Sequence, residues 1–196
     1  IKETMYKRLF TAYGLLTLLI TLGSCSSDET LATERTDITF ETGVAQRVMN
    51  TTWDAGDKIG VFMVKNGTGL DASGIVGGGD NVAYTTTTGN GTFTPTAGGL
   101  KYPADGTAVD FIAYYPYTGS LDNYTYAVDL TNQQHPSTID LLYANDAKGF
   151  NQSSNIVRLN FRHQLVRVEL TIKSADNKQL TGVKVALNDQ PLRATF

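Results

Sequence analysis

Val166-Arg167-Val168-Glu169-Leu170-Thr171-Ile172-Lys173 alternates strictly between apolar and polar side chains. Successive side chains of a β-strand point to opposite faces, so this pattern predicts a strand with one buried face. Residues 183–187 repeat the alternation, and the polar run 174–178 between the two segments supplies turn residues. The two segments are therefore predicted to form a β-hairpin.

The rest of the chain after residue 36 shows the same signals of β structure. Short segments rich in β-branched and aromatic residues are separated by turns rich in glycine and proline, and no sustained helical period appears. Further strands are predicted at 37–41, 58–64, 82–86, 109–115, 124–130, 140–144 and 156–161. Residues 36–196 are therefore predicted to form one all-β sandwich.

The amino-terminal part reads as a bacterial lipoprotein signal. The basic residues Lys7 and Arg8 precede the apolar stretch 9–22, and Leu22-Gly23-Ser24-Cys25 resembles a lipoprotein cleavage box. A membrane-spanning helix needs about 20 apolar residues, and this stretch is shorter and interrupted by polar residues. Residues 1–24 are therefore expected to be a leader and signal peptide, and an unlipidated signal stays open.

Cys25 is the only cysteine, so it cannot form a disulfide within the chain. Its position after the signal predicts acylation, with attachment to outer-membrane lipid through more than one acyl chain. The polar residues 25–35 are expected to form a flexible tether. In bacterial lipoproteins that this segment resembles, acidic residues just after the lipid cysteine mark export to the outer face of the membrane, so the pair Asp28-Glu29 leads us to expect display there.

Charge and motif content argue against several function classes. The chain has 16 basic and 19 acidic residues without a basic stripe, so no nucleic-acid partner is expected. His135 and His163 lack zinc-ligand spacing and are expected at the surface or in turns. The glycine run 74–79 lacks the Gly-Lys-Ser/Thr ending of a phosphate-binding loop. We expect no catalytic residues, no metal and no cofactor.

The tyrosines leave two interpretations open. They could form a platform for a glycan, but tyrosines on strands are more often half-buried core residues with the hydroxyl at the surface. The tyrosines concerned are Tyr102, Tyr114, Tyr115, Tyr117, Tyr124, Tyr126 and Tyr143.

Six short sequence motifs follow one another along the chain. The first is Trp53-Asp54-Ala55-Gly56-Asp57-Lys58-Ile59-Gly60-Val61-Phe62, and the others are 91–95, 101–103, 109–117, 140–144 and 159–168. In this order the motifs resemble the fimbrillin-like family. From the residues alone, Gly56-Asp57 is expected to form a tight turn, Trp53 to cap one end of the core, and Asp110 to bond a neighbouring turn.

The resemblance implies a subunit or anchor of cell-surface pili, exported as a lipoprotein to the outer membrane. It implies transthyretin-like sandwiches of about seven strands, usually two per protein, so this chain is expected to be truncated after the first. It also implies other pilus subunits as partners, through exchange of a strand after an arginine-specific protease removes the first one. Arg47, which follows the strand 37–41 and the loop 43–46, is the predicted cleavage residue, with Arg35 as a second candidate.

Two alternatives remain from the sequence. One is a surface lipoprotein that binds glycans or host ligands as an adhesin. The other is a secreted hydrolase whose catalytic part would lie beyond Phe196.

Overall fold

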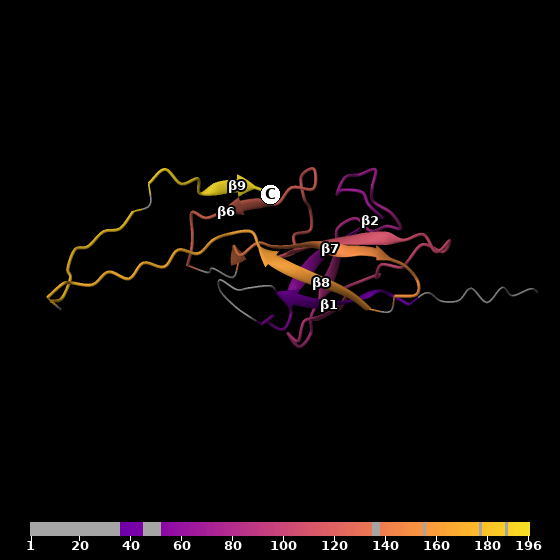
Figure 1. Ribbon diagram of the computed structural model, residues 1–196, viewed down its shortest axis with the longest axis horizontal. Helices are drawn as coiled ribbons and strands as arrows, with labels where there is room; N and C mark the ends of the chain where they lie inside the picture. Colours follow the sequence, from indigo (N-terminus) through magenta and orange to yellow (C-terminus); the bar gives the residue numbers. More distant parts are fainter. Residues whose placement is uncertain (1–35, 45–51, 135–137, 155, 177, 187) are drawn as a thin grey trace, which may run out of the picture. The chain divides into compact units, whose positions relative to one another are not determined.

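The computed structural model of the chain describes residues 36–44, 52–134, 138–154, 156–176, 178–186 and 188–196. These residues form β-strands and no α-helix (Figure 1). The strands are β1 (Thr39–Val44), β2 (Lys58–Lys65), β3 (Val82–Thr85), β4 (Thr92–Pro95), β5 (Val109–Tyr115), β6 (Ala127–Asp129), β7 (Leu142–Phe150), β8 (Ile156–His163) and β9 (Arg193–Thr195). None of the described residues belongs to a helix long and apolar enough to cross a membrane.

Seven of the strands form a closed barrel in the order β1-β4-β3-β2-β5-β7-β8. Neighbouring strands are antiparallel, except that β1 runs parallel to β8. Strands β6 and β9 form a separate two-stranded sheet. The all-β prediction is thus confirmed, and the sheet closes on itself because β1 joins its two ends.

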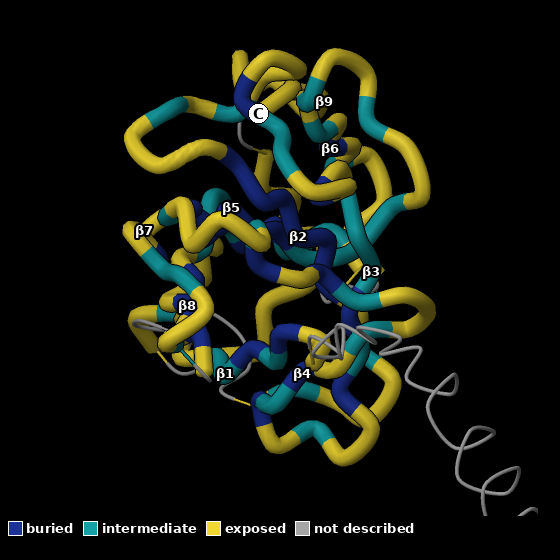
Figure 2. The backbone as a smooth tube through the Cα atoms, turned by 90° about the vertical axis from the view of Figure 1, so that its right-hand side faces the viewer, coloured by how far each residue is buried: buried dark blue, intermediate teal, exposed yellow. Residues whose placement is uncertain are grey.

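The centre of the barrel wall is buried on both sides. In β2, six consecutive residues are buried between an exposed lysine at each end, and β5 begins with six buried residues. Figure 2 shows this burial in dark blue along β2 and β5. Such continuous burial requires cover on both faces of the sheet, as in sheets packed on two sides. In β8, by contrast, buried and exposed residues alternate.

Two apolar clusters cover the two faces of β2. The inner cluster fills the barrel and includes Ile59, Val61 and Met63 from β2. The outer cluster contains Phe62 and Val64 from the opposite face of the same strand. Side chains from the loops after β2 and β5 pack over this outer cluster, namely Leu70, Ile75, Tyr117, Leu121, Tyr124 and Tyr126.

Most predicted strands are observed, with shifted ends. The prediction for 109–115 agrees with β5, and 58–64, 82–86 and 156–161 agree with β2, β3 and β8 to within two residues. Three other predictions were placed less well: β1 extends to Val44, β6 keeps only Ala127–Asp129, and β7 continues to Phe150. Strands β4 and β9 were not predicted, because segments of four and three residues are too short to show a repeated alternation.

The predicted hairpin of 167–173 and 183–187 is wrong. The described residues of both segments form no strand. The apolar side chains that should be buried are open to solvent, with Val166 at 86% exposure and Leu170 at 60%. A strand needs a neighbour for its backbone groups, and none of the described strands pairs with these segments. Alternation alone therefore did not produce a strand.

Candidate functional site

Strand β1 holds a distinctive place in the barrel, because it lies between β4 and β8 and closes the sheet. Its Phe40 lies opposite Phe93 of β4 and Val157 of β8. Six residues of β1 pair with β8 but only two pair with β4. Without β1, the remaining six strands would form an open sheet whose two edges, β4 and β8, have unpaired backbone groups.

The side chain of Phe40 anchors β1 in the core. It is fully buried and meets Tyr84 and Phe111 edge-on, with ring centroids 4.8 and 5.2 Å apart. Burial of an aromatic ring and its edge-to-face contacts are both stabilising. Removing β1 would therefore open a hollow among aromatic rings as well as two strand edges.

Polar contacts add little to the hold on β1. Arg158 and Glu41 form an ion pair 3.3 Å apart, and Lys101 and Asp37 form one of 3.8 Å, with side chains between 41% and 79% exposed. Exposed ion pairs contribute about 0–1 kcal/mol each. The strand is therefore held mainly by its backbone ladder, by Phe40 and by the Thr42 hydroxyl, which donates to the Gly91 carbonyl at 2.9 Å. Another extended segment with an apolar residue in register could supply the ladder and the apolar contact.

Trp53 packs against the inner cluster, as predicted for a residue that caps an end of the core. Its ring meets Phe93, Tyr115 and Phe161 edge-on, at centroid distances of 5.0, 5.2 and 5.5 Å. Phe161 belongs to β8 and Phe93 to β4, which are the two strands on either side of β1. Trp53 therefore contacts both β4 and β8, the two strands between which β1 lies.

The turn before β2 also forms as predicted. Gly56 has a φ of 94°, a left-handed conformation that favours glycine. The backbone N–H of Asp57 donates to the carbonyl of Asp54 at 3.1 Å, and the hydroxyl of Tyr115 donates to the carboxylate of Asp57 at 3.1 Å. These contacts place Ile59 on the inner face of β2.

Asp110 bonds a neighbouring turn, in agreement with the prediction from sequence. Its side chain is fully buried and accepts hydrogen bonds from the Asn66 side chain at 2.7 Å and from the backbone N–H groups of Gly67 at 2.9 Å and Gly149 at 2.8 Å. Lys148 lies 3.3 Å away. The carboxylate therefore ties the turn after β2 to the carboxyl end of β7.

The pKa of Asp110 reflects this network. Burial by itself would raise the pKa of the carboxyl group, but hydrogen bonds from Gly67, Gly149 and Asn66 favour the charged form, as does the Lys148 ammonium. The net result is a pKa below the ordinary value of an aspartate. These contacts hold the turn after β2 against β7.

Of the two histidines, only His163 lies within the described residues. His163 was expected at the surface or in a turn, but its side chain is only 6% exposed at the end of β8. Its Nδ1 lies 2.8 Å from a carboxylate oxygen of Asp140. His135 lies outside the described residues. Within the described part of the chain, no group of histidine, cysteine and acidic residues is placed to hold a metal ion.

The tyrosines do not form one exposed platform. Tyr102 and Tyr114 are buried, and the other five predicted members are partly buried. Burial raises the pKa of Tyr102 and Tyr114 to about 12, consistent with hydroxyls removed from water. The interpretation as half-buried strand residues fits Tyr115 and Tyr143, whereas Tyr114 is buried with its hydroxyl, and Tyr102, Tyr117, Tyr124 and Tyr126 lie outside the strands.

Three residues predicted from sequence to be modified lie outside the described residues: Cys25, Arg35 and Arg47. The position of β1 between β4 and β8 was not predicted from sequence. It depends on parallel pairing between Thr39–Val44 and Ile156–His163, which are more than a hundred residues apart. No local pattern records which distant strand becomes the neighbour.

Comparison with known proteins gives a family and a curated relative whose descriptions agree with each other. A family model described as fimbrillin-like matches residues 46–196. The matched range starts just after β1, which ends at Val44. A curated relative from Bacteroides uniformis, named "Putative fimbrium subunit Fim1C", is 35% identical over 191 residues. The alignment covers 90% of this chain and 61% of the relative, so the chain spans less than two thirds of that protein's length.

Two solved structures resemble the barrel. A crystal structure described as a "putative cell adhesion protein" from Bacteroides uniformis has a TM-score of 0.55 and 32% sequence identity, covering 67% of this chain and 48% of that one. A second protein of the same description, from Bacteroides ovatus, has a TM-score of 0.50 at 22% identity, covering 66% of this chain and 52% of that one. The second similarity shows the fold alone.

Proposed function

Because this chain belongs to the fimbrillin-like family, we propose that it is a structural component of cell-surface pili, either a subunit or an anchor. Family membership favours this role over that of a hydrolase. The names of the relatives place them in fimbriae and in cell adhesion. The finer proposal is that the protein is exported as a lipoprotein and assembles by strand exchange.

The observation that supports strand exchange is the position of β1 as the closing strand. Removing it would leave β4 and β8 with unpaired edges on both sides of a slot, and would open the space of Phe40. An extended segment from another subunit could restore the backbone hydrogen bonds to β4 and β8. One apolar side chain of that segment could fill the space left by Phe40. Such an insertion would join subunits without any change in the other six strands.

Processing at Arg47 fits this arrangement. Strand β1 ends at Val44, and the next strand begins at Lys58. A cut after Arg47 would therefore separate β1, together with an acylated Cys25, from all the other strands of the barrel. Acylation of Cys25 would hold the uncut protein at the outer membrane, as an anchor requires. A subunit that polymerises would lose this attachment.

The exposed segment 166–192 is proposed to be the start of a second β domain. Its alternating apolar residues resemble those of a buried strand, yet no described strand covers them. The longer length of the curated relative is consistent with further strands that could pair with this segment. The reading frame beyond Phe196 tests this: a β-rich continuation supports the proposal, and a catalytic domain contradicts it.

Amino-terminal sequencing of protein taken from assembled pili tests the exchange. The expected first residue is Val48, and Arg47→Ala should block incorporation, whereas the control Arg35→Ala should not. An intact lipidated Cys25 within the pilus would overturn strand exchange and leave the anchor role. Absence of the protein from purified pili would overturn the pilus proposal itself.

A further inference from the structure

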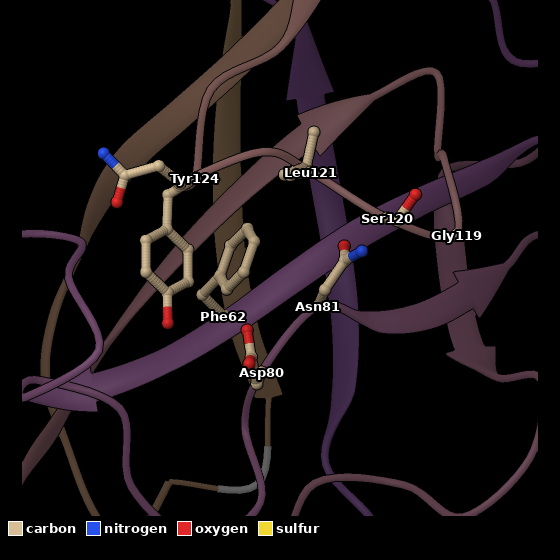
Figure 3. Close-up of a pocket in the computed structure, with 8 residues that line it drawn as sticks. Phe62, Asp80, Asn81, Gly119, Ser120, Leu121 and Tyr124 are labelled. Atoms are coloured by element: carbon tan, nitrogen blue, oxygen red, sulfur yellow. The ribbon is translucent and has the colours of Figure 1, made fainter.

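A hollow with a volume of about 340 Å³ lies on the outer side of β2, away from the slot of β1. Three segments that are distant in sequence meet there (Figure 3). Phe62 comes from β2, Asp80 and Asn81 precede β3, and the remaining lining residues follow β5: Gly119, Ser120, Leu121, Asn123 and Tyr124.

Unusual backbone conformations gather around this hollow. Four described non-glycine residues have a positive φ, and three of them line it: Asn81 at 51°, Asn123 at 46° and Tyr124 at 60°. Asparagine tolerates this region, but a bulky tyrosine adopts it only at a cost in free energy. Strained residues that persist because the surrounding structure enforces them occur preferentially at binding sites.

One wall of the hollow is held rigidly by internal hydrogen bonds. The hydroxyl of Tyr114 lies 2.9 Å from both the side-chain oxygen of Asn81 and the carbonyl of Thr118. The Asn81 side-chain amide donates to the same Thr118 carbonyl at 3.0 Å. The Tyr114 ring crosses β2 at Gly60, where a Cβ would lie 2.2 Å from a ring carbon. The site is therefore shaped before any ligand arrives.

Other polar groups at the hollow are left available. Within the described part of the chain, no hydrogen bond is made by the Asp80 carboxylate, the Ser120 hydroxyl or the Tyr124 hydroxyl. Figure 3 shows the rings of Tyr124 and Phe62 side by side, the Asp80 carboxylate below Phe62, and Ser120 to the right, beyond Asn81. The two rings meet edge-on with centroids 5.8 Å apart.

This arrangement combines the partly exposed ring of Tyr124, which packs on the buried Phe62, with separate hydrogen-bonding groups. A pyranose ring has a face of C–H groups that packs on aromatic rings, and hydroxyls at its edge that both donate and accept. Asp80 can accept from two adjacent hydroxyls, and Ser120 can donate or accept. The volume is near the lower end of ligand sites, about 300–1,000 Å³, which suits one sugar ring.

We propose that the hollow formed by Phe62, Asp80, Ser120 and Tyr124 binds a single neutral pyranose unit of a glycan. The negative charge of Asp80 at the site disfavours sialylated or phosphorylated sugars. This binding does not depend on strand exchange, because β1 contributes none of the lining residues. It would give the pilus protein an adhesive surface of its own.

Saturation-transfer difference NMR on the full chain in detergent tests the proposal. The probes are the methyl pyranosides of glucose, galactose, mannose and N-acetylglucosamine, with sialic acid and choline as charged comparators. At least one neutral pyranoside should bind. Asp80→Asn should weaken its binding about tenfold or more, because a hydrogen bond to a charged group is lost. Tyr124→Asn should do the same while keeping a residue that tolerates the positive φ.

The matched control is Asp122→Asn, which changes an exposed carboxylate of the same loop outside the hollow and should leave binding unchanged. Near-ultraviolet circular dichroism should show that all three variants fold. Binding of none of the neutral probes, binding only of sialic acid or choline, or unchanged binding by both site variants would each overturn the proposal.

Discussion

Strand β8 and the segment 166–173 have the same alternating sequence pattern but opposite fates. In β8 the apolar residues Val157, Leu159 and Phe161 are fully buried, whereas Val166 is 86% and Leu170 60% exposed. Strand β8 has neighbours on both sides, β1 and β7, and the segment has none among the described strands. Alternation therefore determines which face of a strand is apolar, and the neighbours determine whether that face is buried.

Amide hydrogen exchange should show the largest difference between these two regions. Backbone amides in β8 and β2 should open only with global unfolding, at about 5–15 kcal/mol for a natural domain, whereas those of 166–173 should exchange with opening free energies near zero. Mass spectrometry of the exchanging chain measures both. Slow exchange across 166–173 would show that the segment is paired and would remove the contrast.

Truncation of apolar side chains should follow the same division. Phe40→Ala should lower the free energy of unfolding by about 3–5 kcal/mol, because it leaves a cavity among packed rings. The matched change Leu170→Ala, at a residue 60% exposed, should alter it by less than about 0.5 kcal/mol. Urea unfolding of both variants gives the comparison. A loss of equal size for both variants would mean that the segment 166–173 packs against the barrel.

A buried charge in the barrel should matter more than an exposed one. Asp110→Ala should cost about 3 kcal/mol, because the backbone N–H groups of Gly67 and Gly149 lose their acceptor. The control Asp122→Ala removes an exposed carboxylate and should change the free energy of unfolding little. Urea unfolding at neutral pH measures both. If Asp110→Ala left the free energy of unfolding almost unchanged, the stabilising role of this network would be contradicted.

The same network predicts how stability depends on pH. The folded-state pKa of Asp110 is lowered, so its contribution is present above the ordinary aspartate pKa of about 3.9 and is lost as pH falls toward the lowered value. The difference in stability between the wild type and Asp110→Ala should therefore shrink in acid. A difference that stays constant down to pH 3 would show that Asp110 is not the group responsible.

The smallest expected effect concerns the close contact between β2 and β5. Gly60→Ala would place a Cβ 2.2 Å from the Tyr114 ring and should cost about 1–3 kcal/mol. Gly119→Ala meets nothing within 4 Å and should be nearly neutral. Thermal unfolding distinguishes them. If Gly60→Ala is as stable as Gly119→Ala, the Tyr114 ring can move aside without loss.

Local features were predicted well from sequence. The burial of β5 and the strand character of β2 follow from runs of β-branched and aromatic residues, and Gly56-Asp57 forms the expected turn. The bonding of Asp110 to a neighbouring turn was also foreseen. Each of these depends on residues close in sequence or on a carboxylate that must be paired when buried. His163 was misplaced, because nothing in its neighbours in sequence indicates the contact with Asp140.

The sequence by itself determined that the chain is built of β-strands, which face is apolar in an alternating strand such as β8, and the family to which the chain belongs. Only the tertiary structure decided that β1 closes the barrel between β4 and β8, that 166–173 stays uncovered, and that Asp80, Ser120 and Tyr124 surround one hollow. The physical reason is the separation along the chain between the residues that decide each feature. Side-chain alternation is a property of neighbouring residues, whereas strand pairing and the lining of a cavity depend on contacts between residues far apart in the chain.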